Sequence, residues 1–260
     1  MSTVILDFAG PVATLSIHNP TRRNALSRAM WRDMPEKIER AMAQPGVRML
    51  VLQSSTPGTF AAGADISEFE FTYANTSESA KANCEIHAAI DALAKCPVPT
   101  VALIDGPCVG GGMALALGCD IRLASDQARF AITPARLGLS YHPDDITRLV
   151  CACGQALASE LLFGAQIWSA ERSLAAGLIN QMYPADTFAA ASQLLINAIC
   201  ANSLDANRAL KRGIAAALTP SPITVQEVIE EFSTLFAGAD FVEGRNAFLQ
   251  KRPARFPSHH

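Results

Sequence analysis

Three consecutive glycines, Gly110, Gly111 and Gly112, follow an apolar segment and precede a helix-forming one. Glycines at the start of a helix let a ligand approach the backbone closely and leave N–H groups unpaired at the positive end of the helix dipole. Such N–H groups can stabilise a developing negative oxygen. Close packing of the helix against a strand through glycine is the alternative interpretation of this pattern.

The glycine run departs from the common nucleotide-binding motifs. A Walker A loop needs Lys and then Ser or Thr after the glycines, whereas Met113 follows Gly112 here. The dinucleotide fingerprint needs a further glycine at the position of Leu115. A nucleotide-binding module is therefore disfavoured.

A second segment, residues 61–65, reads Ala-Ala-Gly-Ala-Asp and follows a predicted strand and a Pro-Gly loop. Small side chains matter where backbone groups must be presented to a ligand. This segment and the glycine run could therefore each supply one N–H to a carbonyl oxygen. A tight buried turn is the alternative.

The elements that must position these two segments alternate between strands and helices. Predicted strands lie at residues 4–17, as a hairpin, and at 49–52 and 101–104, and predicted helices at 27–43, 77–95 and 113–117. Ser27 is the expected N-cap of the first helix, and Pro35 is expected to kink that helix or shift its start. The alternation predicts an α/β fold on a mostly parallel sheet, with the ligand at the carboxyl ends of the strands.

After about residue 200 the strand signals disappear, and helices are predicted at 204–218, 223–236 and 240–251. We therefore divide the chain into a core of residues 1–200 and a C-terminal helical region of residues 201–260. The helical region is expected to pack on the core or on a neighbouring subunit.

Composition narrows the class of protein. The 260 residues carry a net charge of −3, without the basic excess that nucleic-acid binding requires. The seven cysteines show no repeated zinc-ligand spacing, so we expect reduced thiols and no metal site. No Lys or Arg precedes Arg22, and the uncharged stretch 187–204 has amphipathic helical spacing. These features predict a cytoplasmic protein with no membrane and no nucleic-acid partner.

Five groups of residues occur in order along nearly the whole chain: 24–27, 60–66, 110–112 with 119–121, 133–134 with 137–138, and 248–253. Together they resemble the crotonase (enoyl-CoA hydratase/isomerase) superfamily. The resemblance implies a crotonase/ClpP-like spiral of ββα units and a C-terminal helical region that builds homotrimers or dimers of trimers. It also implies an acyl-CoA substrate, so that coenzyme A enters as part of the substrate and no separate cofactor is expected.

The resemblance also implies site residues. The N–H groups of Ala62 and Gly111 would form an oxyanion hole for the thioester carbonyl. Arg23 and Lys251 would bind coenzyme A phosphates, within basic groups that also include Arg22, Arg245, Arg252 and Arg255; a solvated basic surface is the alternative. The remaining implied substrate-binding residues are Ala61, Gly63, Ala64, Asp65, Ile66 and Gly110.

The chain departs from the family where hydratases carry two glutamates, because Ala114 and Ala135 occupy those places. No Asp or Glu occurs between residues 106 and 119 or between residues 127 and 143. Adding water requires a base to orient it and an acid to protonate Cα. We therefore expect a poor hydratase.

Tyr141 and His142 are the candidate catalytic side chains near the second vacant place. Residues 133–141 are similar to the methylmalonyl-CoA decarboxylase-like branch, where a tyrosine at this place helps shape catalysis. His142 falls where isomerase-like members can carry an acidic catalyst, and an imidazole can move a proton between carbons. A buried structural tyrosine and a helix start at 142–144 are the alternatives. Isomerase activity, decarboxylase activity and non-catalytic acyl-CoA binding therefore all stay open.

Overall fold

The computed structural model describes residues 2–72, 75–218, 227 and 238–257. Its strands are β1 (Thr3–Ala9), β2 (Val12–His18), β3 (Met49–Ser54), β4 (Thr100–Ile104), β5 (Pro107–Val109), β6 (Ile121–Ser125), β7 (Arg129–Ala131), β8 (Trp168–Ser169) and β9 (Gln181–Tyr183). Its α-helices are α1 (Arg28–Ala43), α2 (Phe69–Thr72), α3 (Thr76–Ala94), α4 (Gly111–Gly118), α5 (Pro143–Gly164), α6 (Ala170–Ala175), α7 (Phe188–Ala201), α8 (Leu204–Leu218) and α10 (Ala239–Leu249). Three 3-10 helices are η1 (Pro20–Arg22), η2 (Ile66–Glu68) and η3 (Pro134–Leu137).

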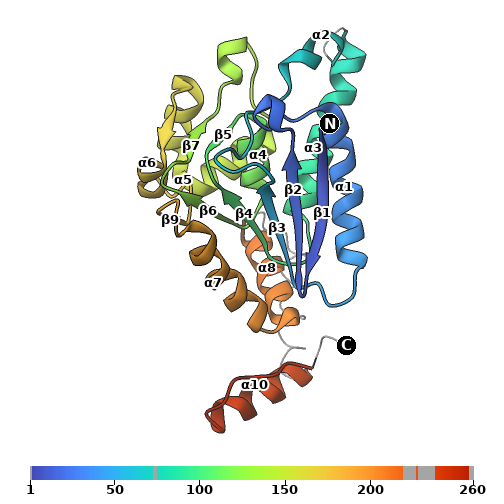
Figure 1. Ribbon diagram of the computed structural model, residues 1–260, viewed down its shortest axis with the longest axis vertical. Coiled ribbons are helices and arrows are strands. Elements are labelled where there is room, and N and C mark those ends of the chain that lie inside the picture. Colours follow the sequence, from blue (N-terminus) through green and yellow to red (C-terminus); the bar gives the residue numbers. More distant parts are fainter. Residues whose placement is uncertain (1, 73–74, 219–226, 228–237, 258–260) are drawn as a thin grey trace.

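The main sheet has the strand order β1-β2-β3-β4-β6-β9, and only the β1–β2 pair within it is antiparallel. The predicted hairpin and the mostly parallel α/β sheet are therefore confirmed (Figure 1). A second, smaller sheet has the order β5-β7-β8. Its strands have only two or three residues, too few to produce a periodic signal in the sequence.

Alternating residues of the central strands pack on opposite faces of the main sheet. Leu50 and Leu52 belong to the large core shared with α1, α3 and α4, whereas Met49 and Val51 pack on the α7 side with Ile196. This alternation follows from the two-residue period of a strand. Both faces of the sheet are covered by helices, so its open ends are left for a ligand (Figure 1).

Helix α1 begins where the sequence predicts, because the Ser27 hydroxyl accepts a hydrogen bond from Met30 N. Pro35 lies inside this helix and does not shift its start. The buried side chains of Met34 and Ile38 hold the helix on the core on both sides of the proline. That packing offsets the backbone hydrogen bond that a proline removes.

In the C-terminal part, α8 and α10 match two of the three predicted helices. The third, over 223–236, lies outside the described residues apart from residue 227. Figure 1 shows α10 beyond the lower end of α8, whereas β2 ends at the opposite side of the molecule. The division of the chain at residue 200 stays a prediction.

Candidate active site

The three glycines of the run have different structural roles. Gly110 adopts a φ of +50° at the turn into α4, and its N–H donates to Ala131 O at 2.9 Å. A Cβ atom on Gly112 would lie 2.7 Å from the Cβ of Ala61. The close-packing interpretation is therefore correct for Gly112, while Gly111 is left at the first position of the helix.

Gly111 N–H is a main-chain donor that is free at the start of α4. As the first residue of α4, Gly111 has no acceptor within its own helix. No other described residue accepts a hydrogen bond from this amide. The positive end of the α4 dipole adds to its capacity to hold a negative oxygen.

The second free donor belongs to Ala64 and not to Ala62. Ala62 N–H donates to the Arg23 carbonyl at 3.2 Å, so the expectation that Ala62 offers a free amide is wrong. Ala64 and Leu26 are paired as in a parallel sheet. The hydrogen bonds of this bridge involve the residues on either side of Ala64, since Leu26 N–H donates to Gly63 O and Asp65 N–H donates to Leu26 O. In this bridge the Ala64 N–H points away from Leu26. Among the described residues, none accepts a hydrogen bond from it.

Gly63 links the two donors in space. A Cβ atom built on Gly63 would lie 3.9 Å from Gly111 N, and the φ of Gly63 is +100°. Any larger residue at this position would be strained and would enter the space between the two segments. The small side chains of residues 61–64 thus allow the loop to approach the start of α4 closely.

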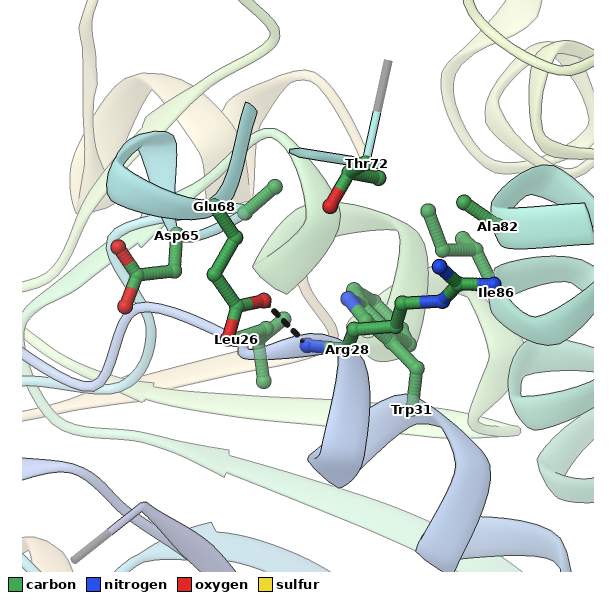
Figure 2. Close-up of a pocket in the computed structure, with 9 residues that line it drawn as sticks. Leu26, Arg28, Trp31, Asp65, Glu68, Thr72, Ala82 and Ile86 are labelled. Carbon is green, nitrogen blue, oxygen red and sulfur yellow. Dashed lines mark hydrogen bonds between the residues drawn. The ribbon is translucent and has the colours of Figure 1, made fainter. Parts of the chain in front are cut away.

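A small pocket, with an empty space of about 290 Å³ including its open mouth, lies beside Ala64, between the start of α1, the η2–α2 segment and α3 (Figure 2). It is lined by Leu26, Arg28, Trp31, Ala64, Asp65, Glu68, Thr72, Ala82 and Ile86. Trp31 also connects the pocket to the glycine run, because a Cβ on Gly111 would lie 2.9 Å from Trp31 Cζ2. Trp31 therefore lies between the pocket and the start of α4, where the Gly111 amide is free.

Arg28, which lines this pocket, is not among the residues that the sequence motifs single out. Arg28 donates to Glu85 from Nε at 2.6 Å and from Nη2 at 3.2 Å, and to Glu78 from Nη1 at 3.1 Å. These carboxylates raise the pKa of Arg28, and hydrogen bonds from Lys81 and then Arg28 lower the pKa of Glu78. Glu68 accepts from the backbone N of Arg28 at 2.7 Å (Figure 2). No sequence motif pairs these residues, because α1 and α3 meet only in the tertiary structure.

Tyr141 lies against the start of α4. Its hydroxyl donates to Gly110 O at 2.9 Å. Burial raises the pKa of Tyr141 well above its ordinary value, so the hydroxyl stays protonated and keeps this hydrogen bond. The contact holds the turn that presents Gly111.

His142 is the N-cap of α5, and its Nδ1 accepts from Asp144 N at 3.3 Å. The helix-start interpretation of this segment is thus confirmed, with His142 itself as the capping residue. Its ring also stacks on His87, with the ring centroids 4.3 Å apart. His87 Nε2 in turn lies 3.5 Å from carboxylate oxygens of Asp91 and Asp144.

A buried ion pair is linked to this histidine pair through Asp91, which lies near both His87 and Arg148. The carboxylate of Asp145 is 4% exposed and accepts from Arg148 Nη1 at 2.8 Å. Arg148 Nη2 donates to Asp91 at 2.8 Å, so Arg148 joins α5 to α3. Burial raises the pKa of Asp145, and the charge and hydrogen bonds of Arg148 partly oppose this shift.

The remaining predicted site residues do not all lie at this site. Asp65 accepts from Arg22 at 3.3 Å, and Ile66 is 70% exposed beside it. Ala61 N–H donates a hydrogen bond to Pro107 O. Arg23 follows η1 near the end of β2, whereas Lys251 follows α10 at the opposite end of the molecule (Figure 1). The role of Arg23 and Lys251 in binding coenzyme A phosphates stays a prediction.

The C-terminal basic stretch is also less free than its sequence indicates. Arg252 donates to both carboxylate oxygens of Glu243, at 2.7 and 2.9 Å. This pair lowers the pKa of Glu243 to about 2. Arg255 N–H donates to the same carboxylate. Arg252 is thus engaged by a residue nine positions earlier in the chain.

The two places where carboxylates are missing lie on α4 and η3. Ala114 is buried in α4, and Ala135 is exposed in η3. The described site therefore combines two main-chain donors, an adjoining pocket and a tyrosine, without a carboxylate at either place.

Comparison with known proteins identifies the family of this chain. The family model described as enoyl-CoA hydratase/isomerase matches residues 7–259. The mitochondrial methylglutaconyl-CoA hydratase of Rattus norvegicus is 30% identical over 94% of this chain and 79% of its own length. The 2,3-dehydroadipyl-CoA hydratase of Escherichia coli is 28% identical over 98% of this chain and 99% of its own.

Solved structures of similar fold carry names from the same family. A crystal structure of an enoyl-CoA hydratase/carnithine racemase from Magnetospirillum magneticum superposes with a TM-score of 0.94 at 31% identity, covering 99% of this chain and 96% of that one. The family match spans the segments that carry the two free amides. The chain therefore belongs to the enoyl-CoA hydratase/isomerase family and has the crotonase fold.

Proposed function

We propose that this protein binds an acyl-CoA and holds its thioester carbonyl between the N–H groups of Gly111 and Ala64, which would stabilise an enolate. The observation that carries the proposal is that these two amides have no acceptor among the described residues, while Gly63 brings their segments close together and Ala64 lines the pocket. Two such donors at a helix start and a small-residue loop suit a developing oxyanion.

The same proposal includes weak hydratase activity. Ala114 and Ala135 offer no proton-transfer group, and hydration needs one group to orient water and another to protonate Cα. Reactions that generate the enolate without a positioned water demand less of the side chains. An isomerase or a decarboxylase therefore fits the site better than an efficient hydratase.

Within that class, His142 is the candidate proton carrier and Tyr141 the residue that positions the turn. His142 is 42% exposed and stacks on His87, so a proton can reach it from solvent. A non-catalytic acyl-CoA-binding protein is the alternative that needs neither side chain.

Replacing Ala64 with proline tests the oxyanion hole directly, because proline removes the N–H. Losing one such donor typically lowers turnover by about 100- to 1,000-fold. Ala64→Gly keeps the amide and is the matched control. Mass spectrometry of a panel of CoA esters, with circular dichroism to check folding, gives the readout. Equal turnover by a folded Ala64→Pro protein and the Ala64→Gly protein would rule out this donor.

We also propose a homotrimer or a dimer of trimers. Helix α8 carries exposed apolar side chains at Leu210, Ile214 and Leu218, four residues apart on one face. Such a stripe is typical of a helix that packs against a partner. Light scattering after size-exclusion chromatography should give three or six times the mass of 27.6 kDa, and a monomer would contradict the proposal.

A further inference from the structure

Resting on the proposed function, we infer that the pocket beside Ala64 selects short, uncharged acyl groups and rejects acyl groups that carry a second carboxylate. Trp31 sets the depth of this pocket, and the carboxylates around Arg28 set its charge.

The depth of the pocket is limited by Trp31. Its side chain is buried at 3% exposure and occupies the space behind Gly111, where a Cβ would lie 2.9 Å from Cζ2. Ala82 and Ile86 of α3 close the side opposite Leu26 (Figure 2). The pocket is small, since its empty space of about 290 Å³ includes the open mouth. A long acyl chain would have to displace the indole.

Arg28 is the cation nearest to this space, and it is already engaged. Its guanidinium donates twice to Glu85 and once to Glu78. One positive charge is thus shared by two carboxylates, although Lys81 also pairs with Glu78. A carboxylate on the substrate would have to compete with both of these partners.

Glu68 adds a further negative charge at the wall. One of its oxygens accepts from Arg28 N, and no described side chain forms an ion pair with it. Asp65, the other acidic residue of the lining, is paired with Arg22. A second carboxylate on the acyl group would therefore meet Glu68 in a partly buried site without a free cation, which is unfavourable.

A matched set of CoA esters tests both parts. We would measure binding of valeryl-CoA, glutaryl-CoA, decanoyl-CoA and free coenzyme A to the full chain by calorimetry. Valeryl-CoA and glutaryl-CoA have acyl chains of equal length and differ in the terminal carboxylate. We expect valeryl-CoA to bind at least tenfold more tightly than either of the other two esters.

Two substitutions should relax one kind of selectivity each. Glu68→Gln should strengthen glutaryl-CoA binding several-fold and leave decanoyl-CoA weak, whereas Trp31→Ala should strengthen decanoyl-CoA and leave glutaryl-CoA weak. If Trp31→Ala does not fold, Ile86→Ala opens the facing wall and should shift the same preference for chain length in the same direction.

The outcomes separate the two proposals. If no ester binds more tightly than free coenzyme A, acyl-CoA binding itself fails and this inference fails with it. If the esters bind but glutaryl-CoA or decanoyl-CoA equals valeryl-CoA in the unmodified protein, only the selectivity is overturned. Tighter valeryl-CoA binding with the two separate responses supports it.

Discussion

The start of α4 and the start of α5 lie next to each other and differ in how they can do chemistry. At α4 the functional groups are main-chain amides among buried small residues, and no ionisable side chain belongs to the helix. At α5 the groups are side chains: His142 caps the helix, and Asp145 is buried against Arg148. Tyr141 joins the two regions through Gly110.

This difference matters for the proposed function, because the chain lacks both family glutamates but keeps the free main-chain amides. A main-chain donor depends on the path of the backbone, so replacing a side chain such as that of residue 114 leaves the donor in place. Proton transfer depends on the identity of a side chain, and one substitution removes it. Under the proposed function, the amides at α4 would bind the thioester, and the side chains at α5 would determine the reaction.

The largest effect on stability is expected from Arg148→Met, which breaks the buried pair at α5. Asp145 would be left buried without a cation, at a cost of about 3 kcal/mol at pH 7. The pKa of Asp145 is already raised by burial and would rise further without Arg148. A raised pKa in the folded state means that stability falls as pH rises through that pKa, so the loss should be smaller at pH 4 than at pH 7.

Urea unfolding at both pH values measures this effect. The double variant Asp145→Asn with Arg148→Met should recover most of the loss, because it leaves no buried charge. An equal loss at pH 4 and pH 7 would contradict the role of Asp145.

A smaller loss, about 2 kcal/mol, is expected from Gly112→Ala at α4. The added Cβ would lie 2.7 Å from the Cβ and 2.9 Å from the backbone oxygen of Ala61, and a backbone cannot move as a flexible side chain can. The melting temperature should fall by about 4–8 °C. Gly164→Ala is the control, since its Cβ meets only Gln166 at 3.5 Å and should change little. Equal melting temperatures for the two variants would show that the α4 packing is looser than described.

Tyr141→Phe tests the link between the two regions. It removes the hydrogen bond to Gly110 O, which is worth about 1 kcal/mol of stability. Because Gly110 precedes the donor Gly111, we expect turnover to fall about tenfold with little change in KM, as for an interaction that acts mainly in the transition state. Steady-state kinetics on the most active CoA ester measures the split. A rise in KM alone would instead assign Tyr141 to substrate binding.

The smallest change in stability is expected from His142→Asn, because asparagine is also a good N-cap and should keep α5 within about 0.5 kcal/mol. Turnover should nevertheless fall by about 100-fold if the imidazole carries the proton. Thermal unfolding and turnover measured on the same preparation separate capping from catalysis. Unchanged turnover would leave capping as the only role of His142.

Much of this site follows from local sequence. The Ser27 cap, the helix after the glycine run and the carboxyl-end position of the ligand loops are set by side-chain types and periodicity over a few residues. The replacement of both glutamates by Ala114 and Ala135 is likewise visible without coordinates. The family resemblance also points to the two segments that carry the free amides.

The tertiary structure decided which groups within those segments are free. The sequence cannot show that Arg23 O takes the amide of Ala62 or that Leu26 leaves the amide of Ala64 open, because both contacts join segments about 40 residues apart. The same holds for Arg28, whose partners Glu78 and Glu85 lie on another helix. Side-chain type and spacing specify local structure and the kind of chemistry available, whereas the partner of each donor depends on how distant segments pack.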